Sequence, residues 1–171
     1  MAFIWEVLVH TPVWVWLLLA GLIWLGWKSS QPGSVSLIRL ALIPAALTAW
    51  GIYELLVVFV PTPFNLLLWG AGLAIGFGIG SVLVRLSEIR VREGGKILKP
   101  ADRTALPLIL LAFLIKYALA VYSAITPHAG DKLLFVCLVL TLGGLFAGIF
   151  IGKLGVFVRA YLAGPRGQTA L

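Results

Sequence analysis

The chain has 171 residues, of which 61% are hydrophobic and 11% are charged, and its mean hydropathy is +1.09. An average soluble domain is about 45–50% apolar and about 25% charged, and a chain this short would leave much of its apolar surface in water. These figures exclude a water-soluble globule and indicate an integral membrane protein. The net charge of +7 would suggest a polyanionic partner if the protein were soluble, but the positions of the charges indicate a different role.

Five apolar stretches reach the length of about 20 residues that a transmembrane helix needs. Their approximate bounds are residues 3–27, 35–60, 64–84, 104–125 and 133–152, and the fifth is expected to continue as a helix through Tyr161. Pro12 leaves open whether the first stretch is one helix or a short interfacial piece followed by a span of marginal length. This stretch is not a typical secretory signal, because no basic residue precedes it, Glu6 lies in its N-terminal part and no A-x-A site follows. The predicted fold class is therefore an all-α integral membrane protein with five transmembrane helices.

The basic residues gather on one side of these predicted helices. Eleven of the 13 Lys and Arg flank the first connection or lie in the loop 85–103 or the tail 153–171, whereas Lys132 alone lies opposite and Lys116 lies within a span. The positive-inside rule then places the N-terminus outside and the loop, the tail and the C-terminus in the cytoplasm of a single transmembrane domain, residues 1–171. The eleven residues are Lys28, Arg39, Arg85, Arg90, Arg92, Lys96, Lys99, Arg103, Lys153, Arg159 and Arg166.

The loop 85–103 is the most basic segment of the chain. It also contains Glu88, Glu93 and Asp102, and it has no aromatic residue on which a nucleic-acid base could stack. We therefore expect the loop to contact anionic lipid headgroups, at about 1 kcal/mol per basic residue near the surface, and we expect no nucleic-acid partner.

The chain contains an internal similarity. Residues 39–63 align with residues 103–127, with nine identities that include Arg39/Arg103, Tyr53/Tyr117 and the Thr-Pro at the end of each segment. After a slip of eight residues, two rows of glycines four apart also align. The pattern predicts one leading helix plus two tandem hairpins of the same orientation, related by an axis along the membrane normal. The alternative is that two segments of similar apolar composition align by chance. The rows are Gly72, Gly76 and Gly80, and Gly144, Gly148 and Gly152.

Glycines four apart lie on one face of a helix, where they allow another backbone to approach closely. The two rows therefore predict helix packing of the glycine-zipper kind. Homo-oligomerisation through one of the rows is the alternative interpretation.

Two charges fall where the bilayer should exclude them. Glu54 lies in the second span and Lys116 near the middle of the fourth, each at an insertion cost of about 2.5–3.5 kcal/mol. The repeat alignment places them within about 3 Å of the same depth, so we predict a buried ion pair flanked by Tyr53 and Tyr117. The pair has either an architectural role or a functional one, as a polar site for an ion, a proton or a small anionic ligand.

No constellation for catalysis is visible: no serine lies beside a credible base, and no paired carboxylates share a helix face. His10 and His128 each lie near a proline at the outer interface, in His-Thr-Pro and Thr-Pro-His. We interpret them as polar residues of this interface, and a haem bound between them is the more distant alternative. Cys137 lies in an apolar run and is interpreted as a packing thiol. We expect no enzyme activity, no metal and no cofactor.

The stretch Ala101-Asp-Arg-Thr-Ala-Leu-Pro-Leu-Ile-Leu, followed by Lys116-Tyr117 after a basic loop, resembles small multi-pass inner-membrane proteins of bacteria. This uncharacterised family has no established activity. The resemblance implies a location in the bacterial inner membrane and transfers no functional residues.

Two functions from different classes remain. The first is a non-enzymatic structural or accessory membrane protein, or a homo-oligomer, in which the charge pair is architectural. The second is a small transporter or channel-like carrier whose polar cavity is lined by Tyr53, Glu54, Lys116 and Tyr117. A haem or quinone redox protein is a third, more distant hypothesis.

Overall fold

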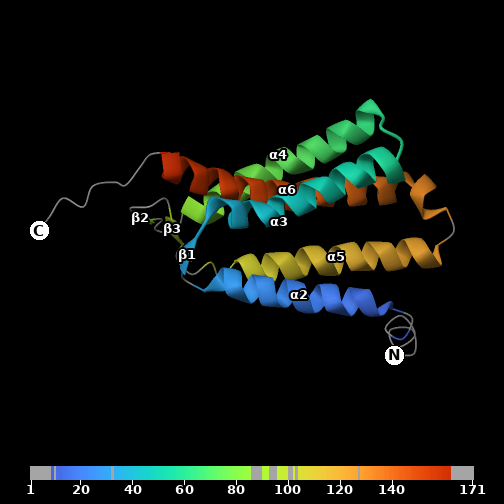
Figure 1. Ribbon diagram of the computed structural model, residues 1–171. Coiled ribbons are helices and arrows are strands. Elements are labelled where there is room, and N and C mark those ends of the chain that lie inside the picture. The colour runs from blue at the N-terminus through green and yellow to red at the C-terminus, as the bar shows by residue number, and fades with distance from the viewer. Residues whose placement is uncertain are drawn as a thin grey trace, which may run out of the picture. The chain divides into compact units, whose positions relative to one another are not determined.

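The computed structural model describes residues 9, 11–31, 33–85, 90–92, 96–99, 102, 104–126 and 128–162. Long helices dominate this part of the chain (Figure 1), and their bounds lie close to the predicted stretches. The helices are α2 (Val13–Ser30), α3 (Leu37–Tyr53), α4 (Pro63–Arg85), α5 (Ala105–Ile125) and α6 (Leu133–Leu162). Shorter elements are the π-helix η1 (Glu54–Val58), the 3-10 helix η2 (Ala129–Asp131) and the strands β1 (Gly33–Val35), β2 (Arg90–Arg92) and β3 (Lys96–Lys99).

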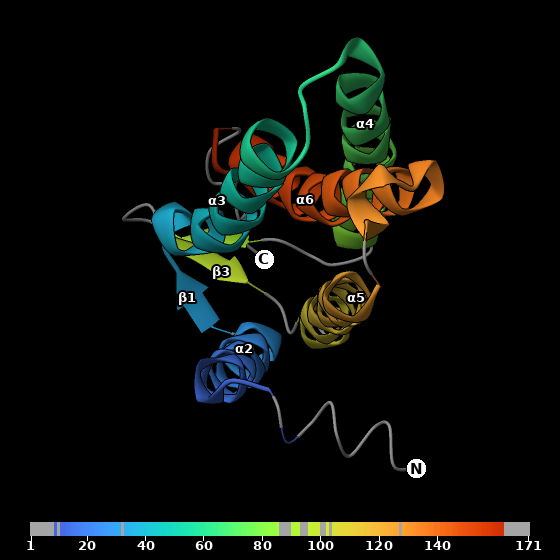
Figure 2. The ribbon, with the colours of Figure 1, turned by 90° about the vertical axis from the view of Figure 1, so that its right-hand side faces the viewer.

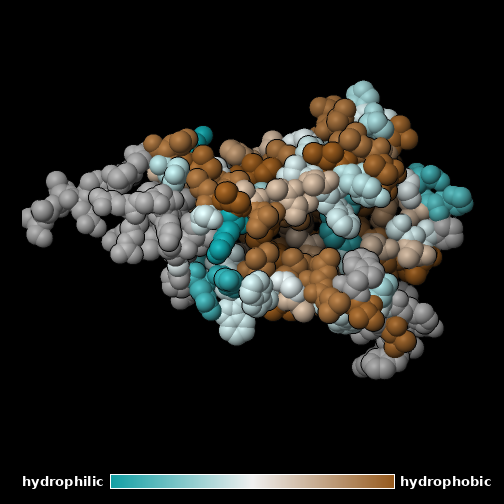
Figure 3. Space-filling view, in the orientation of Figure 1, coloured by the Kyte–Doolittle hydropathy of each residue, from teal (hydrophilic) through white to brown (hydrophobic). Residues whose placement is uncertain are grey.

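Four helical segments are long and apolar enough to cross a membrane: α3 with η1, α4, α5 and α6. Large hydrophobic side chains are exposed along them, such as Leu67 at 71% on α4, and hydrophobic residues predominate on the face that Figure 3 shows. Surface of this kind is suited to lipid rather than to water. As predicted, α6 runs past residue 161; its 30 residues end at Leu162.

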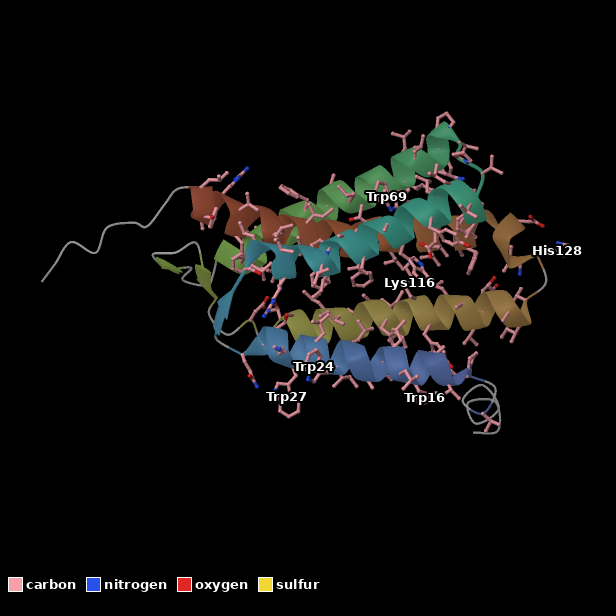
Figure 4. The ribbon with its side chains drawn as sticks, in the orientation of Figure 1. Trp16, Trp24, Trp27, Trp69, Lys116 and His128 are labelled. Atoms are coloured by element: carbon pink, nitrogen blue, oxygen red, sulfur yellow. The ribbon has the colours of Figure 1, made fainter. Side chains whose placement is uncertain are left out.

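Helix α2 lies within the first predicted span. It begins directly after Pro12, has 18 residues and is therefore about 27 Å long, slightly less than the hydrocarbon core of about 30 Å. Trp24 and Trp27 are exposed near its C-terminal end (Figure 4), and Lys28 Nζ lies 4.9 Å from the centre of the Trp24 ring. Indole rings beside a basic side chain are typical of a membrane–water interface.

The chain divides into two compact units, each described here by itself. The first unit comprises residues 1–31 and 101–129 and contains α2 and α5. Gly26, late in α2, lies against Leu106, early in α5: a Cβ at Gly26 would stand 2.6 Å from Leu106 Cδ1 and 3.2 Å from its Cα. Thr11, before α2, hydrogen-bonds the hydroxyl of Tyr117, late in α5. The two helices are therefore antiparallel, and Gly26 marks their closest contact among the glycines of α2.

Replacing Gly26 with leucine should separate α2 from α5 and lower the free energy of unfolding by about 1–3 kcal/mol, because the added side chain overlaps Leu106. The matched control is Gly21→Leu on the same helix, where a Cβ meets nothing within 4 Å; this change should be neutral or stabilise by up to about 1 kcal/mol through helix propensity. Unfolding of both variants by sodium dodecyl sulfate in mixed micelles measures the change in the free energy of unfolding. Equal effects at the two glycines would refute the contact.

In the second unit, residues 32–100 and 130–171, α6 is the central helix. It packs against both α4 and α3 (Figure 2). An 18-residue window of α6 is 56% buried, compared with 22% for α4 and 17% for α3 with η1. Near the C-terminal end of α6, Phe157 packs with Val84 of α4, and Leu37 and Leu40 of α3 complete this cluster.

A small antiparallel sheet accompanies the second unit, with strand order β1-β3-β2. The all-α prediction describes the spans but not this sheet, which uses the connection before α3 and the loop 85–103. The strand residues Arg90-Val91-Arg92 and Lys96-Ile97-Leu98-Lys99 flank Gly94-Gly95 in the sequence, a pattern typical of a hairpin. The sequence predicts a basic loop here rather than strands, because Arg and Lys occupy four of the seven strand positions of β2 and β3.

Candidate functional site

The two glycine rows face each other across α4 and α6. An added Cβ would overlap a backbone carbonyl oxygen of the opposite helix at all six glycines, at distances below the 3.0 Å that real Cβ atoms essentially never show. On α4, Gly72, Gly76 and Gly80 meet the carbonyls of Thr141, Leu145 and Ile149, respectively; on α6, Gly144, Gly148 and Gly152 meet those of Trp69, Leu73 and Phe77. We call this contact the glycine seam. Here the two helices meet backbone to backbone, which only glycine permits.

The glycine seam is symmetric in its contacts. Gly72 meets the carbonyl of the residue three before Gly144, and Gly144 meets the carbonyl of the residue three before Gly72. The same offset relates Gly76 to Gly148 and Gly80 to Gly152. Because the contacts advance in the same direction along both helices, α4 and α6 are parallel. Each row is occupied by the other, so neither row is left for a second copy of the chain.

Glu54 lies where α3 changes into the π-helix η1. Its side chain is half-buried, and Trp50 Nε1 donates a hydrogen bond of 2.9 Å to Glu54 Oε1. The backbone N–H of Phe59 donates to the Glu54 carbonyl oxygen, five residues back, at 2.9 Å. Tyr53, the predicted neighbour, is 54% exposed. The predicted acidic residue therefore coincides with an irregular helical turn, a feature that is frequent at functional sites.

Trp69 on α4 approaches the same part of α3. A Cβ at Gly51 would stand 2.6 Å from Trp69 Nε1, so this glycine makes room for the indole. The Trp69 Nε1–H is buried and has no hydrogen-bond partner among the described residues. The pairing of Gly51 with an indole carries no signal in the sequence.

Lys116 and Tyr117 lie on α5, in the first unit (Figure 4). Both side chains are half-buried. The Tyr117 ring stacks on Phe113, with centroids 6.1 Å apart and planes 10° from parallel, and its hydroxyl reaches Thr11. Tyr53 and Glu54 belong to the second unit. Glu54 and Lys116 thus belong to different units, and their pairing stays a prediction.

Lys153 is a charged residue whose burial the charge pattern of the sequence does not indicate. We counted it among the cytoplasmic topology markers, but it is only 5% exposed and is the charged side chain that the described part of the chain buries. Its Nζ lies 6.0 Å from the centre of the Phe150 ring. Lys153 lies within α6, as predicted, and directly follows Gly152, where α4 and α6 meet backbone to backbone. Its aliphatic stem suits such a position.

The remaining candidates do not form a site within the described residues. His128 is exposed on the turn between α5 and α6, with a φ of 56° (Figure 4), and His10 lies outside the described residues. Groups of three or more His, Cys, Asp or Glu that could hold a metal are absent from the described part of the chain. Cys137 is half-buried on α6.

The chain matches the model of a family of unknown function, DUF6622, over residues 2–167. No curated protein matches the chain, and no solved structure matches it.

Proposed function

The chain belongs to the DUF6622 family, whose function is unknown, and we propose on geometric grounds that it is a non-enzymatic, multi-pass membrane protein with a structural or accessory role. Its apolar helices are compatible with a membrane protein. We place it in the bacterial inner membrane with the N-terminus outside and the C-terminus in the cytoplasm. The basic residues support this orientation. Helices α4 and α6 run in the same direction, and basic residues occur at or after the C-terminal end of each: those of β2 and β3 after α4, and Arg159 in the last turn of α6.

The single observation that carries the proposal is the glycine seam. Backbone atoms of the opposite helix occupy the space beside each of the six glycines, which supports packing of α4 and α6 of the glycine-zipper kind. Backbone-to-backbone packing of this type is suited to a rigid scaffold.

The symmetry of the seam supports an origin of the chain by tandem duplication. Glycines that align in the sequence make equivalent contacts, each with the residue three before its counterpart in the other helix. Parallel repeats related by an axis along the membrane normal would produce this reciprocal pattern. The helices α3 and α5 would then be the equivalent first helices of the two hairpins.

We further propose that Glu54 and Lys116 form an intramembrane ion pair that fixes the positions of α3 and α5. The support is energetic: each charge alone costs about 2.5–3.5 kcal/mol in a bilayer, and the repeat places the two at nearly equal depth. Glu54 is also oriented by the Trp50 indole at 2.9 Å, which holds the carboxylate in one place.

A small transporter or channel-like carrier is the second candidate function. The observation that favours it is the π-helix that starts at Glu54, because irregular turns at intramembrane charges often line ion or proton paths. In this case Tyr53, Glu54, Lys116 and Tyr117 would line the polar site, and the charge of Glu54 would be needed for flux.

Flux measurements on proteoliposomes separate the two functions. With pH-sensitive and potassium-sensitive dyes inside the vesicles, the structural role predicts the same leak of protons and potassium as in protein-free vesicles. Proton or cation flux that Glu54→Gln abolishes would contradict the structural role and support the carrier. The matched control is Asp131→Asn, which removes an exposed carboxylate in η2 and should leave any such flux unchanged.

A further inference from the structure

Two indole N–H groups from different helices lie beside the same turn of α3. Trp50, in α3 itself, donates a hydrogen bond of 2.9 Å to Glu54 Oε1. Trp69 reaches this turn from α4 (Figure 4), and its Nε1 atom lies 2.6 Å from where a Cβ of Gly51 would stand. All four residues belong to the second unit. The turn therefore has one indole donor in use and a second one beside it.

The second donor has no acceptor among the described residues. The side chain of Trp69 is half-buried, but its Nε1 atom is fully buried. A buried donor without an acceptor loses the hydrogen bonds that water would give it, and the hydrocarbon core of a bilayer offers no water in exchange. Groups of this kind are rare in folded proteins, so the Trp69 N–H requires a physical explanation.

The acidic side chain of the same turn is placed to supply the acceptor. Helical side chains point back over the preceding turn, so each covers the positions three and four before its own. For Glu54 these positions are Gly51, where the Trp69 indole lies, and Trp50, which the carboxylate already contacts. The backbone N–H of Glu54 is likewise shared between the carbonyls of these two residues. Because a carboxylate has two oxygens, Oε1 can stay with Trp50 while Oε2 accepts from Trp69.

We propose that the protein has a closed state in which the Glu54 carboxylate bridges the two indoles. Trp50 Nε1–H donates to one oxygen, and Trp69 Nε1–H donates to the other. The bridge ties α3 to α4 at the turn where the π-helix η1 begins, and it gives the buried Trp69 donor an acceptor. Glu54 then acts as a latch between two helices. The latch goes beyond the structural role proposed above and does not depend on a contact with Lys116.

Solid-state NMR of the full chain in lipid bilayers tests the latch, with ¹⁵N at the tryptophan indoles and ¹³C at the glutamate carboxyl carbons. Rotational-echo double resonance then reports which indole nitrogens lie close to a carboxylate. Trp50 is the positive control, since its nitrogen lies 2.9 Å from Glu54 Oε1, and Trp27, exposed on α2, is the negative control. The Trp69 nitrogen should dephase to the same extent as that of Trp50. The variants Trp50→Phe and Trp69→Phe assign the two signals.

The unchanged chain decides the outcome of this experiment. Dephasing at Trp50 without dephasing at Trp69 would overturn the proposal. A Trp69 indole proton shifted downfield by a hydrogen bond, but without dephasing by glutamate, would also overturn it, because the acceptor would then be water or a backbone carbonyl. Neither result bears on the glycine seam or on the structural role, so the latch can fail while both stand.

A comparison of variants gives a second readout. Trp69→Phe removes the N–H and also some ring volume, so its effect is measured in the unchanged chain and in Glu54→Gln, where one acceptor oxygen remains for Trp50. The variant should raise the equilibrium constant of unfolding roughly tenfold more in the unchanged chain, because the bond to the carboxylate is lost only there. The matched control is Trp16→Phe, at an exposed indole of α2, whose effect should be the same in both backgrounds. Equal effects of Trp69→Phe in the two backgrounds would refute the bridge.

Discussion

Replacing Gly76 with alanine should lower the free energy of unfolding by about 2–3 kcal/mol. The new methyl group would overlap the carbonyl oxygen of Leu145 and come within 2.9 Å of the amide nitrogen of Ile149. Backbone atoms cannot rotate away as a flexible side chain can, so α4 and α6 must separate along part of the glycine seam. The cost is that of an overpacked core, about 1–3 kcal/mol, with the loss of backbone contacts on either side. Unfolding by sodium dodecyl sulfate in mixed micelles, followed by circular dichroism, measures it.

The control for this experiment lies two residues further along the same helix. At Gly78 a Cβ meets nothing within 4 Å, so Gly78→Ala adds a methyl group to an exposed face. This variant should unfold at the same or a slightly higher detergent concentration, since alanine has a helix propensity about 1 kcal/mol better than glycine. If both variants lose stability equally, the cost is a general property of α4 and the glycine seam is not its cause.

Replacing Glu54 with glutamine should reduce the yield of folded protein more than replacing both Glu54 and Lys116. Glutamine keeps an oxygen that can accept the hydrogen bond from Trp50 Nε1, so the single variant removes the charge and leaves the local contact. An unpaired lysine inside a bilayer then costs about 2.5–3.5 kcal/mol, and breaking a buried pair costs about 3–5 kcal/mol in proteins generally. In Glu54→Gln/Lys116→Met no charge is left uncompensated, so part of the stability should return.

Folded yield after membrane extraction, measured by size-exclusion chromatography, compares the two variants. Asp131→Asn, which changes an exposed carboxylate, controls for the removal of an acidic residue and should leave the yield unchanged. Additive losses from Glu54→Gln and Lys116→Met would show that the two charges do not interact.

Much of the fold could be predicted because lipid imposes a simple rule on the sequence. Long apolar stretches must be helical in a bilayer, and the bounds of α3, α4, α5 and α6 follow from where those stretches begin and end. Pro12 likewise marks the start of α2, because proline is tolerated at the beginning of a helix and not in its interior. The glycines four apart indicated close approach of a backbone. They did not indicate which helix approaches, since spacing describes one helix at a time.

Other features could not be predicted because they depend on contacts between distant segments. The burial of Lys153 depends on which face of α6 packs against its neighbours. In the sequence, a basic residue after an apolar run is equally typical of an exposed residue at the cytoplasmic end of a span. The sheet required pairing of residues 33–35 with 97–99, more than 60 positions apart in the chain. The π-helix at Glu54 has no sequence signature, although the charged residue at its start was found from its insertion cost.

The most direct test of the glycine seam is solid-state NMR of the protein in lipid bilayers, with ¹³C at the glycine α carbons and the threonine carbonyl carbons. The Thr141 carbonyl carbon lies 3.1 Å from where a Cβ of Gly72 would stand, so we expect a strong cross peak between the Gly72 α carbon and the Thr141 carbonyl carbon at short mixing time. Replacing Thr141 with serine should remove that peak and so assign it. Absence of the peak, as expected for helices at the ordinary separation of about 8–10 Å, would contradict the glycine seam.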